Sequence, residues 1–245
     1  MHAVSATSPI HLRPATELAE RVLLPGDPHR ALAVAQAVLE KPLMFNHARG
    51  LWGYTGTAPD GAPLSVQSTG MGGPSAAIVI EELIDLGARS LIRIGTCAAL
   101  APGLELGTLV TAHEVVAADG VSAALGAAPR LTADERLTRA LVEGGAPAVT
   151  AVSTDLFYDP RSHILAQWRS AGAEVIEMEA ATLLALAARR GVTGAVLLAV
   201  SDVLGAQSRE RIGPGALEEA GIALGRAGYA ALATAPGHDQ RPPED

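Results

Sequence analysis

The chain has 245 residues, of which 49% are hydrophobic and only 3% aromatic, so its core must come mostly from Ala, Val, Leu and Ile. A formal net charge of −8 argues against a surface that binds nucleic acid or an anionic membrane. The single cysteine, Cys97, excludes an internal disulfide and a cysteine-rich metal site, and the histidines show no metal-ligand spacing.

No linker or internal repeat divides the sequence, so we expect one domain over residues 1–245. Its ordered core should span about 10–234, and the polar, proline-rich end at 235–245 should be disordered. We find no signal segment and no apolar run of transmembrane length, which makes a cytoplasmic protein without membrane contact the default expectation.

The first candidate site is a strand-to-helix corner near the start of the chain. Residues 21–24 predict a strand, and Asp27 and Pro28 suit the N-cap and first position of a helix that continues to residue 39. Gly26 lets a backbone N–H approach a ligand, and Arg30 lies in the first helical turn, where an anion is favoured. The pattern fits an anion site or an ordinary turn, and both interpretations stay open.

The central unit of the chain lies between residues 64 and 95. Residues 44–57 predict strands with a turn near 48–50, where Arg49 should be exposed and solvated. A strand over 64–68, a small-residue turn at 69–73, a helix starting at Pro74 and a strand over 90–95 then follow. Such a unit predicts parallel strands joined by a right-handed crossover.

Arg93 is the unexpected residue of this unit, because it interrupts a strand that is otherwise apolar. A buried guanidinium needs an anionic partner. That partner is either an Asp or Glu in a structural ion pair, or a bound phosphate or carboxylate. The position of Arg93 just before Gly95 and Thr96, at the carboxyl end of the strand, favours the bound anion.

The second half continues the alternation of strands and helices. We expect strands over 107–116, 148–153, 174–178 and 194–200. We expect helices over 132–144 with Thr132 as cap, from Asp159-Pro160 to about 170, over 180–190 and over 216–234. Residues 118–129 and 204–215 are expected to be loops.

Side chains suited to binding follow three of these strands. Phe157 and Tyr158 form either a stacking wall or part of the core. Glu179 either caps the following helix or accepts hydrogen bonds from vicinal hydroxyls, as on a sugar. Asp202 emerges from an apolar strand, where desolvation would raise its pKa as a general acid requires; the alternative is an ordinary turn aspartate.

Together these segments resemble a known family. The segments are residues 24–30 (LPGDPHR), 68–75 (STGMGGPS), 92–97 (IRIGTC), 177–181 (EMEAA) and 201–202 (SD). In this order they resemble the nucleoside phosphorylase family that contains the hexameric bacterial purine nucleoside phosphorylases and the uridine phosphorylases. The resemblance covers about residues 10–232. It implies a three-layer α/β/α sandwich around a mixed, partly barrel-like sheet, and cleavage of a nucleoside by phosphate.

The resemblance also implies roles for individual residues. Phosphate would be bound by Gly26, Arg30, Arg93 and Thr96, with Arg49 supplied by the neighbouring subunit. The ribose would be held by Met71, Met178 and Glu179, with His11 from a partner. The base would lie near Cys97, Phe157, Ile176 and Glu177, with Asp202 as general acid and Arg209 or Arg211 assisting it. No metal or organic cofactor is implied, because inorganic phosphate is the co-substrate.

Within this family the base-contacting positions favour a purine. Ser201-Asp202 matches the purine branch, and no insertion with a Gln-x-Arg pair follows Phe157-Tyr158. Gln167 and Arg169 do spell that pair, but in a later helix. Residues 68–70, 72–74 and 180–184 look more like the uridine branch. A purine nucleoside phosphorylase is therefore the leading prediction.

Four alternatives remain. They are a uridine phosphorylase, a methylthioadenosine phosphorylase, a nucleosidase that uses water, and a non-catalytic nucleoside-binding protein. Three arginines argue against the nucleosidase, because water needs no cationic clamp. The resemblance further implies a homohexamer, built as a trimer of dimers with sites shared between subunits, that works in purine salvage.

Overall fold

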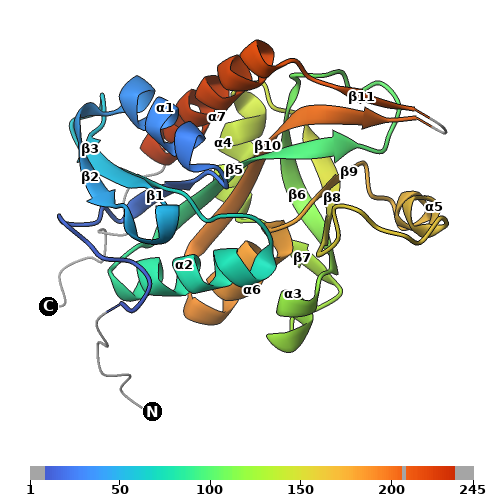
Figure 1. Cartoon of the computed structure of the whole chain (residues 1–245), viewed down its shortest axis with the longest axis horizontal. Helices are drawn as coiled ribbons and strands as arrows, with labels where there is room; N and C mark the ends of the chain where they lie inside the picture. Colours follow the sequence, from blue (N-terminus) through green and yellow to red (C-terminus); the bar gives the residue numbers. More distant parts are fainter. Residues whose placement is uncertain (1–8, 206–207, 235–245) are drawn as a thin grey trace, which may run out of the picture.

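The structure is a computed structural model that describes residues 9–205 and 208–234. The tail expected to be disordered, 235–245, lies outside the described residues. Helices cover both faces of a central sheet, which gives three layers (Figure 1). The α/β/α sandwich predicted from the sequence is thereby confirmed.

The helices fall into two groups (Figure 1). On one face lie α1 (Pro28–Val38), α4 (Glu135–Glu143) and α7 (Pro214–Thr234). On the other lie α2 (Gly73–Asp85), α3 (Gly120–Ala124) and α6 (Ala180–Arg190), while α5 (Ile164–Ser170) stands at one end. Buried aliphatic side chains fill both interfaces, for example Leu83 and Leu183 on one side, and Val34, Leu141 and Leu224 on the other.

The described strands form a single mixed sheet that is partly closed on itself. Its strands are β1 (Arg21–Leu24), β2 (Glu40–Asn46), β3 (Gly53–Thr57), β4 (Pro63–Gln67), β5 (Ser90–Ala99), β6 (Leu109–Ala118), β7 (Arg130–Thr132), β8 (Ala148–Thr154), β9 (Val175–Glu177), β10 (Thr193–Leu204) and β11 (Arg209–Arg211). The order is β11-β10-β6-β8-β9-β5-β1-β4-β3-β2, with β7 on β6. Because β10 also pairs with β5, the strands β10, β6, β8, β9 and β5 close into a ring. The partly barrel-like sheet was predicted correctly.

The strands of the predicted central unit have the expected parallel direction. The strands β4 and β5 are parallel, yet β1 lies between them and pairs in parallel with both. Three parallel strands therefore end side by side, and Leu24 of β1 is opposite Arg93 of β5. This arrangement brings the turn after β1, the turn after β4 and Arg93 to one edge.

Several local predictions need correction. Thr132 belongs to β7, and α4 is capped by Asp134, whose carboxylate accepts the Leu137 N–H at 2.9 Å. The helix α5 begins at Ile164 because the Asp159 carboxylate accepts the Arg161 N–H at 2.9 Å and closes a turn instead.

The two predicted loops also contain regular structure. Residues 118–129 include α3, which Asp119 caps through the Ser122 N–H at 2.9 Å. Residues 204–215 include β11, which pairs antiparallel with the end of β10. Among the described residues no helix is both long and apolar enough to cross a membrane.

Candidate active site

The candidate site forms where the turns after β1 and β4 meet. The Thr69 N–H donates to the Pro25 carbonyl at 2.9 Å, and the Gly70 N–H donates to the Gly26 carbonyl at 3.0 Å. A Cβ on Gly26 would lie 3.1 Å from the Gly70 carbonyl oxygen, so the two turns are in close contact. The Asp27 cap predicted for α1 is confirmed, since its carboxylate accepts the Arg30 N–H at 2.7 Å.

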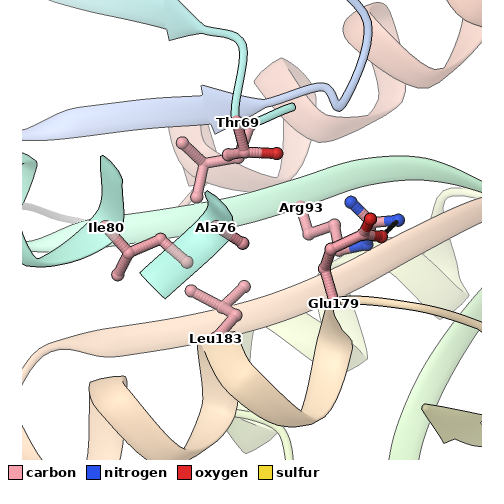
Figure 2. A pocket seen from close by; sticks show the side chains of 7 residues that line it. Thr69, Ala76, Ile80, Arg93, Glu179 and Leu183 are labelled. Atoms are coloured by element: carbon pink, nitrogen blue, oxygen red, sulfur yellow. Dashed lines mark ion pairs between the residues drawn. The ribbon is translucent and has the colours of Figure 1, made fainter. Parts of the chain in front are cut away.

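Arg93 lies below these turns and forms ion pairs with two carboxylates. It is only 6% exposed. Its Nε donates to Glu177 Oε2 at 2.9 Å, and its Nη2 pairs with Glu179. Figure 2 shows the Arg93 and Glu179 side chains pointing toward each other. Burial alone would lower the pKa of Arg93, but the charges of Glu179 and Glu177 outweigh it and raise that pKa. The structural ion pair, the less favoured interpretation of the sequence, is therefore present.

Glu177 has a fully covered side chain whose contacts are all structural. Its carboxylate accepts the Ser153 hydroxyl, Arg93, and the backbone N–H groups of Glu179 at 2.8 Å and Ala180 at 2.9 Å. It thus satisfies the first N–H groups of α6 and fixes Arg93 at the same time. A contact between Glu177 and the base stays a prediction. Because the carboxylate is covered, only the backbone of Glu177 could make that contact. Ser153 was missed by sequence reasoning; its only signal was its place at the carboxyl end of β8.

Glu179 precedes α6 but does not cap it with its side chain. Its Oε1 accepts the Gly72 N–H at 2.5 Å, and its other oxygen pairs with Arg93. Burial raises the pKa of Glu179, and nearby Glu177 raises it further, while Arg93 opposes both. The cap interpretation is therefore wrong, and the carboxylate instead lies between the turn after β4 and Arg93.

Arg30 supplies a second cation beside this cluster. Burial lowers its pKa, and so does the nearby charge of Arg93, although Asp27 and Glu179 raise it. Its stem packs against α7, where a Cβ on Gly221 would be 3.3 Å from Arg30 Cγ. Among the described residues no carboxylate lies within ion-pair distance of the Arg30 guanidinium. Its donors are therefore available to an anion at the carboxyl ends of the strands.

A small pocket of about 10 Å³ lies behind the cluster. It is lined by Leu24, Thr69, Ala76, Ile80, Arg93, Glu179 and Leu183 (Figure 2). It has room for about one water molecule and is far smaller than a pocket for an organic ligand. The side chains around this pocket therefore pack closely and form the inner wall of the site. A ligand would bind on the outer side of Arg93 and Glu179.

Gly95 gives a direct test of how tightly Arg93 is held. The guanidinium crosses over this residue, and a Cβ on Gly95 would lie 2.7 Å from Arg93 Nη2 and 2.8 Å from Cζ. Because two buried carboxylates fix the guanidinium, Gly95→Ala must displace it or strain β5. We expect a loss of roughly 1–3 kcal/mol in the free energy of unfolding, measured by urea denaturation. Gly215→Ala, at an exposed position of α7 with open space around it, is the comparison; equal losses would contradict a fixed Arg93.

Asp202 stands at the end of β10 and is the second charged centre. Its side chain is 4% exposed. Oδ1 accepts from Arg209 Nε at 2.8 Å, with Arg211 Nη1 more distant at 3.6 Å, and the Ser201 hydroxyl donates to Oδ2 at 2.8 Å. Burial raises the pKa of Asp202, but the hydrogen bonds of Arg209 and Ser201 and the arginine charges outweigh it and leave that pKa lowered. The raised pKa expected from the sequence is wrong, because the apolar strand revealed burial but not the arginines.

The aromatic pair extends from this second centre. Phe157 is 50% exposed and Tyr158 is 87% exposed, so the core-packing alternative is wrong. The Arg209 guanidinium lies over the Phe157 ring, 4.7 Å from its centroid, a cation–π geometry. Ile176 is half-buried on β9, opposite Ala98 of β5. A planar group could stack against this wall beside Asp202.

Cys97 and Thr96 lie between the two centres on β5. Cys97 is buried, its thiol donates to the Ala199 carbonyl at 3.7 Å, and burial raises the pKa of that thiol. Thr96 is half-buried and Met178 likewise. Because β5 and β10 are paired in parallel through this region, the arginine cluster and Asp202 belong to one continuous edge.

Met71 is 87% exposed, in the turn whose Gly70 contacts Gly26 and whose Gly72 contacts Glu179. Two other predicted residues have no polar contact with this edge in the part of the chain that the structure describes. Arg49 is exposed on the short 3-10 helix η1 (Ala48–Gly50), and the His11 Nδ1–H donates to Glu82 Oε1 of α2 at 2.7 Å. Neither Arg49 nor His11 has a hydrogen bond or ion pair to another predicted site residue within residues 9–205 and 208–234. In that part of the chain no His, Cys, Asp and Glu side chains gather in a group that could hold a metal ion.

Fold and charge together indicate the class of protein: an α/β protein with a cationic cluster at the carboxyl ends of its parallel strands, the edge where such folds bind ligands, and a half-exposed aromatic wall beside it. Comparison with known proteins is more specific. The chain belongs to the phosphorylase superfamily, whose profile matches residues 20–226. The family resemblance seen in the sequence is therefore confirmed.

Individual relatives agree. The chain is 39% identical over 199 residues to a protein of Clostridium perfringens named purine nucleoside phosphorylase DeoD-type, covering 77% of this chain and 83% of the relative. It is 40% identical over 200 residues to a Caldanaerobacter subterraneus protein of the same name, covering 77% and 84%. A solved structure of purine nucleoside phosphorylase from Toxoplasma gondii in complex with immucillin-H matches with a TM-score of 0.78 and 27% identity, covering 89% of this chain and 93% of that one.

Proposed function

We propose that this chain is a purine nucleoside phosphorylase. It cleaves a purine ribonucleoside or deoxyribonucleoside with inorganic phosphate and releases the free base and the pentose 1-phosphate. The observation that carries the proposal is the arrangement of two charged centres on one edge: the Arg30–Arg93 pair for phosphate, and Asp202 with Arg209 and Phe157 for the base. The names of the curated relatives point to the same substrates.

The geometry suggests how the reaction proceeds. A phosphate oxygen bonds to C1′ while the C1′–N bond breaks and its electron pair moves onto the base. The sugar passes through an oxocarbenium-like state, as in glycoside hydrolysis. Arg30 and Arg93 hold the dianion below that carbon, where its charge stabilises the sugar cation. We assign the ribose hydroxyls to the Glu179 carboxylate, whose two oxygens contact Gly72 and Arg93 at this edge and keep lone pairs for further hydrogen bonds.

The departing base needs a proton, which the phosphate supplies overall. Because the Asp202 pKa is lowered, this group is ionised at neutral pH. We therefore assign it the task of stabilising a proton on N7 of the purine as the bond breaks, with Arg209 fixing its orientation. This revises the general acid expected from the sequence, since a proton stored on Asp202 would require a raised pKa.

We further propose a homohexamer, a trimer of dimers with shared sites, in the cytoplasm and in purine salvage. Arg49 and His11 support shared sites, because both are accessible and neither binds the site of its own chain. Inorganic phosphate is then the co-substrate, and the reaction as written needs no metal or organic cofactor. The whole of residues 1–245 is proposed to act as one domain.

The first experiment is turnover of inosine, adenosine and uridine by the purified protein, with and without phosphate, followed by release of free base. We expect purine release that depends on phosphate. Uridine turnover would show that the base pocket accepts a pyrimidine instead of a purine. Release of free base without phosphate would show that the protein is a nucleosidase. 5′-Methylthioadenosine is the fourth substrate, because none of the residues proposed for phosphate, ribose or base distinguishes one 5′ group from another. Binding without turnover would mark a nucleoside-binding protein.

The shared site predicts the effect of removing Arg49. Arg49→Ala should raise the KM for phosphate roughly tenfold or more, because one of three cations on the dianion is lost. Initial rates measured across phosphate concentrations at saturating nucleoside give this value. Arg13→Ala removes another exposed arginine and should leave it unchanged. An unchanged phosphate KM in Arg49→Ala would exclude the shared site.

A further inference from the structure

Two fully buried amide side chains, Asn46 and Gln67, hold the turn that carries Arg49. Asn46 closes the turn, because its Nδ2 donates to the Leu51 carbonyl at 2.5 Å and its Oδ1 accepts the Ala48 N–H at 3.2 Å. Gln67 of β4, which β3 separates from β2, donates through Nε2 to the same Leu51 carbonyl at 3.0 Å. Both ends of the turn are therefore tied to the sheet.

The conformation of Arg49 itself requires such support. Its φ of 58° and ψ of 19° lie in the left-handed region, which a residue with a side chain adopts at a cost. Such a conformation persists only where the surrounding structure holds it. The hydrogen bonds of Asn46 and Gln67 to the flanking residues Ala48 and Leu51 supply that support.

The buried Gln67 side chain carries a cost in stability. Its Oε1 is buried and has no hydrogen-bond partner among the described residues. The amide cannot turn over, because Nε2 faces two carbonyl oxygens, those of Leu51 and Ser68. The opposite strand accommodates the side chain only through Gly53, where a Cβ would lie 1.9 Å from Oε1. A buried acceptor without a partner is unfavourable, so Gln67 does not serve stability through this oxygen. What the residue contributes is the two hydrogen bonds that Nε2 donates.

Through Gln67 the Arg49 turn is also joined to the site of its own chain. Nε2 donates to the Ser68 carbonyl at 2.9 Å, and Ser68 begins the turn that meets Gly26. The Leu51 side chain packs on the same turn, since a Cβ on Gly70 would be 3.4 Å from Leu51 Cδ2. One amide therefore contacts both the Arg49 turn and the turn that lines the local site.

We propose that Asn46 and Gln67 are positioning residues for phosphorolysis. They hold Arg49 in the left-handed conformation in which it reaches the phosphate of the neighbouring subunit, and Gln67 ties that arginine to the turn at 68–73 of its own chain. This inference rests on the proposed function and in particular on the role of Arg49. Neither amide touches substrate; both act through Arg49.

The test is Gln67→Met, which keeps the length of the side chain but cannot donate. We expect the KM for phosphate to rise roughly three- to tenfold, because Arg49 is less often in position, with kcat at saturating phosphate changed less than about twofold. In an Arg49→Ala background, Gln67→Met should raise that KM no further. Ser65→Ala is the matched control: it also removes two buried hydrogen bonds of a β4 side chain, to Thr55 at 3.0 Å and from the Ala19 N–H at 2.9 Å, away from the Arg49 turn.

Each outcome is decisive. The inference is overturned if Gln67→Met leaves the phosphate KM unchanged. It is also overturned if Gln67→Met raises that KM equally with and without Arg49→Ala, or if Ser65→Ala raises it as much as Gln67→Met does. If Arg49→Ala alone has no effect, the shared site of the proposed function fails first, and the two failures are distinguished. Melting temperatures of all variants show which are folded. Should Gln67→Met not fold, Asn46→Ala in both backgrounds provides the same comparison.

Discussion

Arg93→Met is expected to destabilise the protein by about 3–5 kcal/mol at neutral pH, because it leaves two buried carboxylates without their cation. The same change should lower kcat/KM for phosphate by a factor of roughly 10²–10³, the usual cost of removing one charge-stabilising donor. Urea denaturation gives the first value, and initial rates with varied phosphate give the second.

The pH dependence separates charge from packing in this variant. Without Arg93, the pKa of Glu179 in the folded protein should lie further above its unfolded value, because burial and the nearby charge of Glu177 are no longer opposed by a cation. Stability that depends on protonated carboxyls is present at low pH and is lost as the pH rises through the folded pKa. The deficit of Arg93→Met should therefore shrink as the pH falls from 7 toward 5. A constant deficit would contradict a charged cluster.

Two further variants complete this comparison. Adding Glu179→Gln to Arg93→Met removes one uncompensated charge, keeps an acceptor for the Gly72 N–H, and should restore part of the lost stability. Arg21→Met breaks an exposed pair with Asp60, 2.6 Å long and at the opposite end of β1. It should cost less than about 1 kcal/mol, as surface pairs do. A similar loss in both single variants would show that burial of the Arg93 pairs contributes nothing.

The convergence of Gly26, Arg93 and Glu179 could be predicted from the sequence. Each follows or ends an apolar strand, and parallel strands present their carboxyl ends at the same edge. The insertion of β1 between β4 and β5 could not be predicted, because strand order depends on pairing between distant segments. The ion-pair partners of Arg93 could not be predicted either. The alternation of side chains places Glu177 and Glu179 on one face, but it does not show which cation they contact.

The surroundings of Asp202 were the least predictable part of the site. The segment Arg209–Arg211 has no apolar residue and is typical of a loop, yet backbone pairing with β10 makes it the strand β11. The period of two along a strand then turns Arg209 and Arg211 to the same face, toward Asp202. The sequence showed desolvation alone, and the sign of the pKa shift depends on these arginines. The same hairpin selects Arg209 as the closer partner.

Asp202→Asn is the second change expected to have a large effect, a loss of roughly 10²–10⁴ in kcat for purine nucleosides. Asparagine keeps the shape and an acceptor for Arg209, but it cannot offer a negative charge to a proton on N7. The KM for phosphate should stay the same, because phosphate binds at the arginine cluster. Rates with inosine at saturating phosphate measure the effect. Asp60→Asn, which removes a carboxylate paired with Arg21 far from this edge, is the matched control and should retain activity.

The stability deficit of Asp202→Asn should also shrink as the pH falls, but because the native protein loses stability when Asp202 is protonated, not because the variant gains it. The folded pKa of Asp202 is lowered, so the carboxylate adds stability above its unfolded pKa of about 3.9, and this contribution is lost as the pH falls through the lower folded value. The melting temperature of the native protein should therefore exceed that of Asp202→Asn from pH 5 to 8, and the gap should close below about pH 4. A gap that widens in acid would mean that Asp202 is protonated in the folded enzyme. The general acid first expected from the sequence would then be restored.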